Sequence, residues 1–137
     1  MKGAVWRSAA TRVLVHVAAL AVFVTLNWSV AQPALRALVV GMGALTAAFG
    51  LLVAGGYTQR SAVQASFVVG IIVAECAGAL TFWKLAPVVA GATAWLSFYT
   101  VEGLVERAQE GSLTRTVAAE YSAVALVGAA VVLLTAH

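Results

Sequence analysis

The chain has 137 residues, of which 63% are hydrophobic and only 9% are charged. Soluble domains carry about 25% charged residues, so this composition excludes an ordinary water-soluble domain. The net charge of +3 comes from cations spread along the chain and not from one basic patch, so we expect no nucleic-acid partner.

A regular spacing of cations predicts the fold. Arg12, Arg36, Arg60 and Lys84 follow one another at intervals of 24 residues, and Glu75 is the only other charged residue between the first and the last. A bilayer core of about 30 Å needs about 20 apolar residues of helix, so each interval predicts one membrane crossing and a short turn. Two more spans fit after Lys84. We therefore predict an all-α integral membrane protein, a bundle of about five transmembrane helices with short loops that forms one polytopic domain over residues 1–137. The predicted spans are 13–31, 34–55, 61–82, 85–105 and 116–136.

The first span also fits a second interpretation. Cations precede its apolar run, and Ser29-Val30-Ala31 resembles the cleavage site of a signal peptide. The apolar run continues through Trp28 for nearly a whole span, so we expect an uncleaved helix. His16 lies one turn inside this helix, and heme ligation would need a second imidazole at the same depth. His137 is the only other histidine and falls on the opposite face, so we expect no cofactor, and His16 to hydrogen-bond Glu120 or a backbone carbonyl.

Small residues recur at helical spacing in the second, third and fifth spans. Helices in lipid gain no hydrophobic energy by touching, so small residues promote association by letting backbones approach. The simplest prediction is a tight five-helix bundle, and the functional alternative is that these faces dock another copy or another membrane subunit. The three stripes are Gly43, Ala47, Gly50 and Ala54; Gly70, Ala74 and Gly78; and Ala118, Ser122, Ala125 and Ala129.

Glu75 is the first candidate for a functional site. It lies 15 residues after Arg60 and nine before Lys84, which places it in the hydrocarbon region. An ionised carboxylate there costs several kcal/mol unless it is paired, so we expect Glu75 to face protein. Two interpretations stay open: an ion, proton or partner-anchoring site, or a protonated carboxyl that hydrogen-bonds Thr46 or Thr93.

The second candidate is a group of charges at one membrane face. Glu102, Glu106 and Glu110 follow at intervals of four, so they share one side of the fourth span as it leaves the membrane. Like charges at this spacing repel, so cations should lie opposite. We predict a salt-bridged cytoplasmic rim, preferred over a cation-binding vestibule, with an ion pair at Glu120. Its members are Glu102, Glu106, Glu120, Arg12, Arg60, Arg107 and Arg115.

The distribution of cations predicts the orientation. Six cations fall on the side of the N-terminus and only Arg36 and Lys84 fall on the other, so the positive-inside rule places the N-terminus inside and the C-terminus outside. We expect the inner (cytoplasmic) membrane of a bacterium or archaeon. The six are Lys2, Arg7, Arg12, Arg60, Arg107 and Arg115.

The motifs of catalysis are missing from the sequence. It has one cysteine and neither a Ser/His/Asp set, an HExxH pair nor a glycine-rich phosphate loop, so we expect no enzyme and no metal site. Our preferred hypothesis is a small non-catalytic subunit of a larger membrane complex of the energy-transducing kind, which docks through small-residue helix faces. The alternative is a homo-oligomeric channel or transporter with Glu75 as its ion or proton site. The expected partners are the lipid bilayer and either other membrane subunits or the chain itself.

Overall fold

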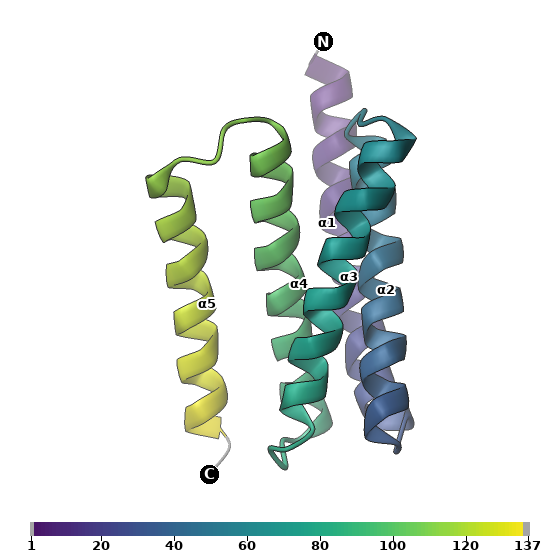
Figure 1. Cartoon of the computed structure of the whole chain (residues 1–137), viewed down its shortest axis with the longest axis vertical. Helices are drawn as coiled ribbons and strands as arrows, with labels where there is room; N and C mark the ends of the chain where they lie inside the picture. The colour runs from purple at the N-terminus through teal and green to yellow at the C-terminus, as the bar shows by residue number, and fades with distance from the viewer. Residues whose placement is uncertain (1, 136–137) are drawn as a thin grey trace.

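The computed structural model describes residues 2–135, with side chains described for residues 9–132 and 134–135. This part of the chain forms five helices and no strand (Figure 1). All five are long and apolar enough to cross a membrane, which confirms the predicted fold class. The helices are α1 (Lys2–Ser29), α2 (Pro33–Ala54), α3 (Gln59–Leu80), α4 (Pro87–Gln109) and α5 (Arg115–Thr135).

The helix ends lie where the turn residues favour them, with two differences from the predicted spans. Pro33 and Pro87 occupy the first turns of α2 and α4, where the missing N–H is not needed. Gly56 and Gly111 have positive φ of 88° and 67° in the connections that follow α2 and α4. Helix α1 begins at residue 2, before the predicted span at 13, and α4 continues to residue 109 beyond the predicted 105, so Glu106 is helical and Glu110 is the C-cap.

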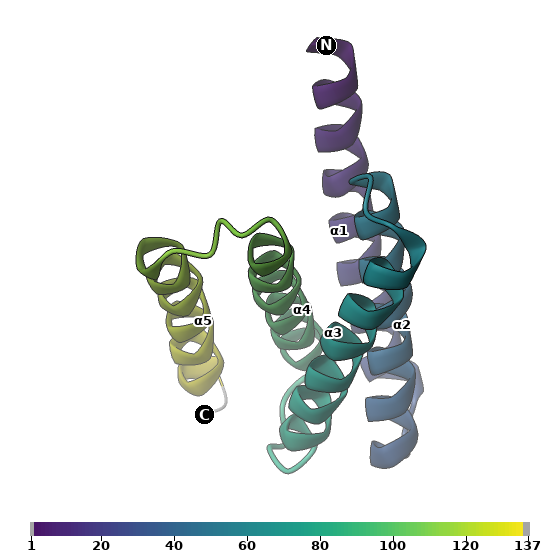
Figure 2. The same ribbon diagram turned by 45° about the horizontal axis from the view of Figure 1, so that its top comes forward.

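Helices α1 to α4 form a closed ring. In the described chain α1 packs against α2 and α4, and α3 packs against α2 and α4, while α5 contacts α4 and no other helix. Figures 1 and 2 show α5 at the edge of the molecule, beside α4 and away from α2. The start of α1, the α2–α3 connection and the α4–α5 connection share one end of the molecule. We call this the α4–α5 loop end.

The centre of the ring is apolar. Phe23 of α1 and Phe98 of α4 are 1% and 0% exposed, and their rings meet edge to face with centroids 6.0 Å apart. Val40 of α2 and Val69 of α3 complete this core with no exposed surface. The ring is therefore held by large side chains on the α1–α4 side and by smaller ones on the α2–α3 side.

Glycine and alanine bring α2 and α3 into close contact. A Cβ added at Gly41 would lie 2.6 Å from the Cβ of Ala74 and 2.9 Å from the carbonyl oxygen of Gly70. Gly70 and Ala74 thus use their small size inside the chain. The exposed ends of the predicted stripe on α2, Gly50 and Ala54, take no part in this contact.

The predicted stripe on α5 is only partly correct. Ala118 and Ala125 are half-buried, whereas Ser122 and Ala129 are exposed. Tyr121 and Gly128 contact α4 instead, and neither of them belongs to the predicted stripe.

Candidate functional site

Glu75 is exposed on the outer face of α3, so the expectation that it faces protein is not met within the described chain. Its neighbour Ala74 packs against α2, but consecutive residues of a helix point about 100° apart, so Glu75 turns away from that contact. The hydroxyls of Thr46 and Thr93 do not bond it. They donate to backbone carbonyls one turn earlier in their own helices, at 2.9 and 2.7 Å.

The surroundings of Glu75 form an exposed apolar ridge. Val63, Phe67 and Ile71 precede Glu75 and Ala79 follows it, all at intervals of four along α3, and all four are exposed. Phe67 and Ile71 are 54% and 55% exposed, which is high for large apolar side chains in a packed protein. We call these five residues the α3 ridge. In a bilayer the ridge would bring one carboxyl into contact with hydrocarbon.

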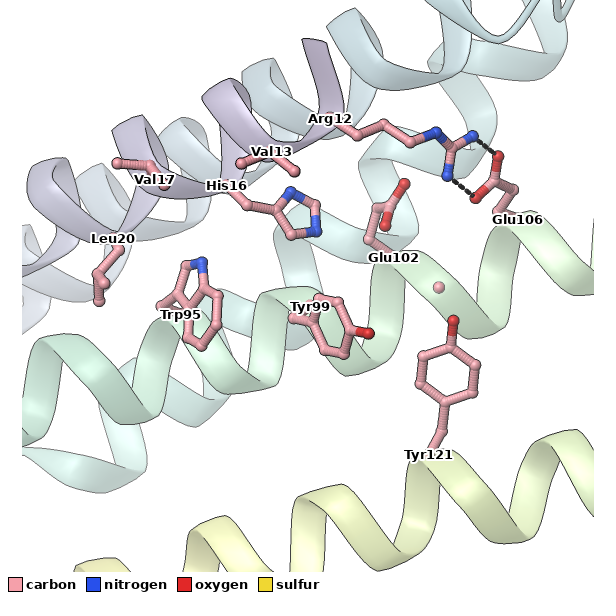
Figure 3. A pocket seen from close by; sticks show the side chains of 11 residues that line it. Arg12, Val13, His16, Val17, Leu20, Trp95, Tyr99, Glu102, Glu106 and Tyr121 are labelled. Atoms are coloured by element: carbon pink, nitrogen blue, oxygen red, sulfur yellow. Dashed lines mark hydrogen bonds and ion pairs between the residues drawn. The ribbon is translucent and has the colours of Figure 1, made fainter. Parts of the chain in front are cut away.

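At the α4–α5 loop end, Arg12 of α1 and Glu106 of α4 form a bidentate ion pair (Figure 3). Nη1 of Arg12 donates to Oε2 of Glu106 at 2.6 Å, and Nη2 donates to Oε1. The Glu106 side chain is 12% exposed and the Arg12 side chain 42%. A fork of two charge-assisted hydrogen bonds fixes both side chains and joins the first and fourth helices.

The other charges predicted for this end do not join that pair. Glu120 is exposed and no arginine nitrogen of the described residues lies within 4.0 Å of its carboxylate, so the prediction of an ion pair there is wrong. The reason is the rotation of α5 about its own axis. This rotation turns Tyr121 toward α4, so the preceding residue, Glu120, points away from that contact. Arg60 and Arg115 are exposed, and neither forms an ion pair with any residue described.

Two weaker contacts lie at the same end. Arg107 pairs with Glu110 at 3.4 Å across an exposed turn, a geometry that contributes little to stability. Gln109 and Ser61 exchange hydrogen bonds at 3.0 and 3.4 Å and join the end of α4 to the start of α3. Tyr57, in the α2–α3 connection outside the spans, has its phenol pKa raised by partial burial and by nearby carboxylates.

Glu102 has a different environment from every other carboxylate of the chain. It is 4% exposed and lies one turn before Glu106 on α4. Within the described residues no side chain forms a hydrogen bond or an ion pair with its carboxylate, because the Arg12 guanidinium is directed at Glu106. Figure 3 shows the Glu102 carboxylate between this pair and His16.

Glu102 lines a groove of about 540 Å³ between α1, α4 and α5. Aromatic rings make up much of its floor: Trp95 and Tyr99 of α4 stack at 6.0 Å, and Tyr121 of α5 lies 6.1 Å from Tyr99. Val13, Val17 and Leu20 of α1 form the apolar side of the groove (Figure 3).

His16 also lines this groove, which corrects the expectation of a hydrogen bond to Glu120 or to a backbone carbonyl. Its ring meets the edges of Trp95, Phe98 and Tyr99, with centroids 6.4, 5.5 and 5.4 Å away. Two buried polar atoms of the groove have no hydrogen-bond partner in the described structure: Nδ1 of His16 and Nε1 of Trp95. Such atoms are uncommon in native proteins and mark a place where a further group can bind.

The aromatic residues of the groove were missed by the sequence analysis. Trp95 and Tyr99 are four residues apart and precede Glu102 and Glu106 on nearly the same side of α4, so this spacing could have placed them together. No such signal exists for Tyr121. Its position depends on how α5 packs, and a Cβ at Gly103 would collide with its hydroxyl, so the ring fits only because Gly103 has no side chain.

Five apolar helices, four of them closed into a ring, define a polytopic helical membrane protein with an aromatic, charged groove near one end. A family model described as "Protein of unknown function (DUF5656)" matches residues 7–135, and the chain belongs to this family. No curated protein and no solved structure matches the chain.

Proposed function

We propose that the protein is a small non-catalytic subunit of a larger membrane complex, and that the α3 ridge is the surface on which its partner docks. One observation carries this proposal: Glu75 is exposed, five residues before the end of a helix that is long enough to span the membrane. A carboxyl in hydrocarbon is costly whether it is ionised or merely lacks a hydrogen-bond partner. A partner helix would remove that cost.

The chemistry of the ridge indicates what the partner must offer. It should present a helix with an apolar surface to cover Phe67 and Ile71, and a cation or hydrogen-bond donor at the depth of Glu75. A second copy of the chain is less suitable, because Arg12 is already paired with Glu106 and the other described lysine and arginine side chains lie near helix ends or in connections. Two copies would bring two carboxyls together, which repel unless they share a proton.

The test is site-specific photo-crosslinking in native membranes. A benzophenone amino acid replaces Phe67 or Ile71 on the ridge, and replaces Leu126 on α5 as the control, because Leu126 is 70% exposed and lies on another helix. We expect the two ridge positions to give one discrete product with a different chain, identified by mass spectrometry. The product should persist in Glu75→Gln, which retains a hydrogen-bonding side chain, and disappear in Glu75→Leu.

Three outcomes would overturn the proposal. Products with lipid alone would show that the ridge has no protein partner, and equal products from Leu126 would show that the contact is not specific. A product with a second copy of the chain would favour the homo-oligomeric channel or transporter. In that case ion flux into proteoliposomes should be present in the wild type and absent in Glu75→Gln.

A further inference from the structure

The groove between α1, α4 and α5 is open toward the surrounding lipid. Helix α4 forms its floor, and α1 and α5 form its two sides (Figure 3). These two helices do not touch each other in the described chain, so no contact between them closes the mouth of the groove there. Its volume of about 540 Å³ falls in the range of about 300–1,000 Å³ that is typical of small-molecule sites.

Polarity changes along the groove in the direction of the helices. The charged residues Arg12, Glu102 and Glu106 lie toward the α4–α5 loop end, and Leu20 and Trp95 lie deeper. Trp95 precedes Glu102 by seven residues, which is about 10 Å along a helix. An amphipathic molecule parallel to the helices would match this order, with its polar head near Glu102 and its apolar body beside Leu20.

The charges of the groove favour a positive ligand. The guanidinium of Arg12 is matched by Glu106 in a bidentate pair, which leaves the buried Glu102 as the carboxyl without a partner of its own. The rings of Tyr99 and Tyr121 lie on the same stretch of the groove. Aromatic faces attract organic cations, most strongly where water is excluded, and a carboxylate among them adds direct charge complementarity.

We propose that this groove binds a monocationic amphiphile, a molecule with an ammonium-like head held by Glu102, Tyr99 and Tyr121 and an apolar body that lies along Val17, Leu20 and Trp95. A zwitterionic phospholipid fits less well, because its phosphate needs a cation and the only arginine of the groove is already paired. This proposal is independent of the docking surface on α3.

The first test measures binding of tetraphenylphosphonium, a rigid lipophilic cation, to the purified full chain in an uncharged maltoside detergent. Equilibrium dialysis should give saturable binding with one site per chain. Tetraphenylborate has the same shape and the opposite charge, and we expect it to bind at least about tenfold more weakly, a difference of about 1.4 kcal/mol. Equal binding of both ions would overturn the proposal.

Variants then locate the site. Glu102→Gln should weaken tetraphenylphosphonium binding about tenfold, whereas Glu120→Gln, which removes an exposed carboxylate elsewhere, should leave the affinity unchanged. Val17→Trp fills the groove from its open side, where Val17 is 60% exposed, and should abolish binding. Leu126→Trp is its matched control on the exposed side of α5 and should bind as the wild type does.

The Val17→Trp result decides the question if Glu102→Gln does not fold. Wild-type affinity in a folded Val17→Trp variant would overturn the proposal.

A last comparison uses two detergents with the same tail, dodecyltrimethylammonium and dodecylphosphocholine, as competitors. We expect the first to displace tetraphenylphosphonium at a lower mole fraction. Both carry a trimethylammonium group, and equal displacement would show that an added phosphate costs no affinity, contrary to the charge argument.

Discussion

Two contacts between neighbouring helices, α2–α3 and α4–α5, both use glycine, but in different ways. In the first, a Cβ at Gly41 would meet the backbone of Gly70 and the Cβ of Ala74, so two backbones lie against each other. In the second, Gly128 receives the end of the Leu96 side chain, and a whole side chain separates the helices. Backbone contact leaves no space between helices, and side-chain contact leaves room for a groove.

The difference separates a tightly packed part of the chain from a part that leaves a groove. The α2–α3 contact belongs to the closed ring, which has a dry apolar core. Helix α5 lies outside the ring, and the unpartnered polar atoms Nδ1 of His16 and Nε1 of Trp95 line the groove beside it. We therefore expect substitutions in the apolar core of the ring to affect folding and substitutions of the side chains that line the groove to affect binding.

The largest expected effect concerns the topology of α5. Because this helix contacts only α4, the experiment asks whether it crosses the membrane. Reporter proteins fused after Gln59 and at the C-terminus should report opposite sides, because three helices separate the two points. The cation distribution predicts that the first fusion is inside. Reporters on the same side would mean that α5 lies outside the membrane. The groove beside α5 would then not be a membrane site that can be contrasted with the closed ring.

The next effect concerns the backbone contact. Gly41→Ala places a methyl group 2.6 Å from the Cβ of Ala74, and neither helix can yield without moving its neighbour. We expect a loss of about 2–3 kcal/mol in the free energy of unfolding, measured by denaturant titration in mixed micelles. Gly50→Ala on the same helix is the control. Its added Cβ meets nothing within 4 Å, so its stability should be unchanged or slightly higher.

A smaller loss is expected from the ion pair that joins α1 to α4. Arg12→Gln leaves the carboxylate of Glu106 largely buried without its cation, and should cost about 2 kcal/mol, less than a fully buried pair because Arg12 is 42% exposed. The double variant Arg12→Gln/Glu106→Gln should recover part of that loss. Arg107→Gln, in the exposed pair with Glu110, should cost less than about 0.5 kcal/mol. No recovery in the double variant would contradict the pairing.

The smallest effect should appear at the side-chain contact of α5. Gly128→Ala would collide with the end of Leu96, but a leucine side chain can change rotamer, so we expect a cost below about 1 kcal/mol. The same titration as for Gly41→Ala gives the comparison directly. A loss as large as that of Gly41→Ala would show that α5 packs as tightly as the ring helices.

The sequence was sufficient for the helices because charge-free intervals of the right length have few alternatives in a membrane protein. It was not sufficient to predict which face of each helix packs against its neighbours. Glu75 was expected to face protein because lipid is costly for a carboxyl, yet its neighbours Ala74 and Gly78 already occupied the packed side of α3. The energetic cost of exposing one residue to lipid does not determine which face of its helix packs inside the chain, when a partner molecule is able to supply the missing contact.

The groove was still harder to predict from the sequence. That Arg12 and Glu106 lie at the same end follows from the order of the spans, but which carboxylate the arginine selects depends on side-chain positions. The α5 side of the groove depends on Tyr121, which lies over Gly103, a contact between residues 18 positions apart with no shared pattern. Glu120 was expected to pair because an unpaired acid one turn inside the fifth span is costly and several arginines end at the same face. Helix α5 instead turns the next residue, Tyr121, toward α4 and leaves Glu120 exposed.

The placement of α5 also has a consequence for biosynthesis. A membrane protein is inserted from its N-terminus, so α1 to α4 enter the bilayer before α5 has been translated. All contacts of the ring are made among these four helices, and the ring can close before the fifth helix arrives. The last helix then joins a finished bundle along one seam, and until it does, the face of α4 that carries Tyr99 and Glu102 is accessible from the side.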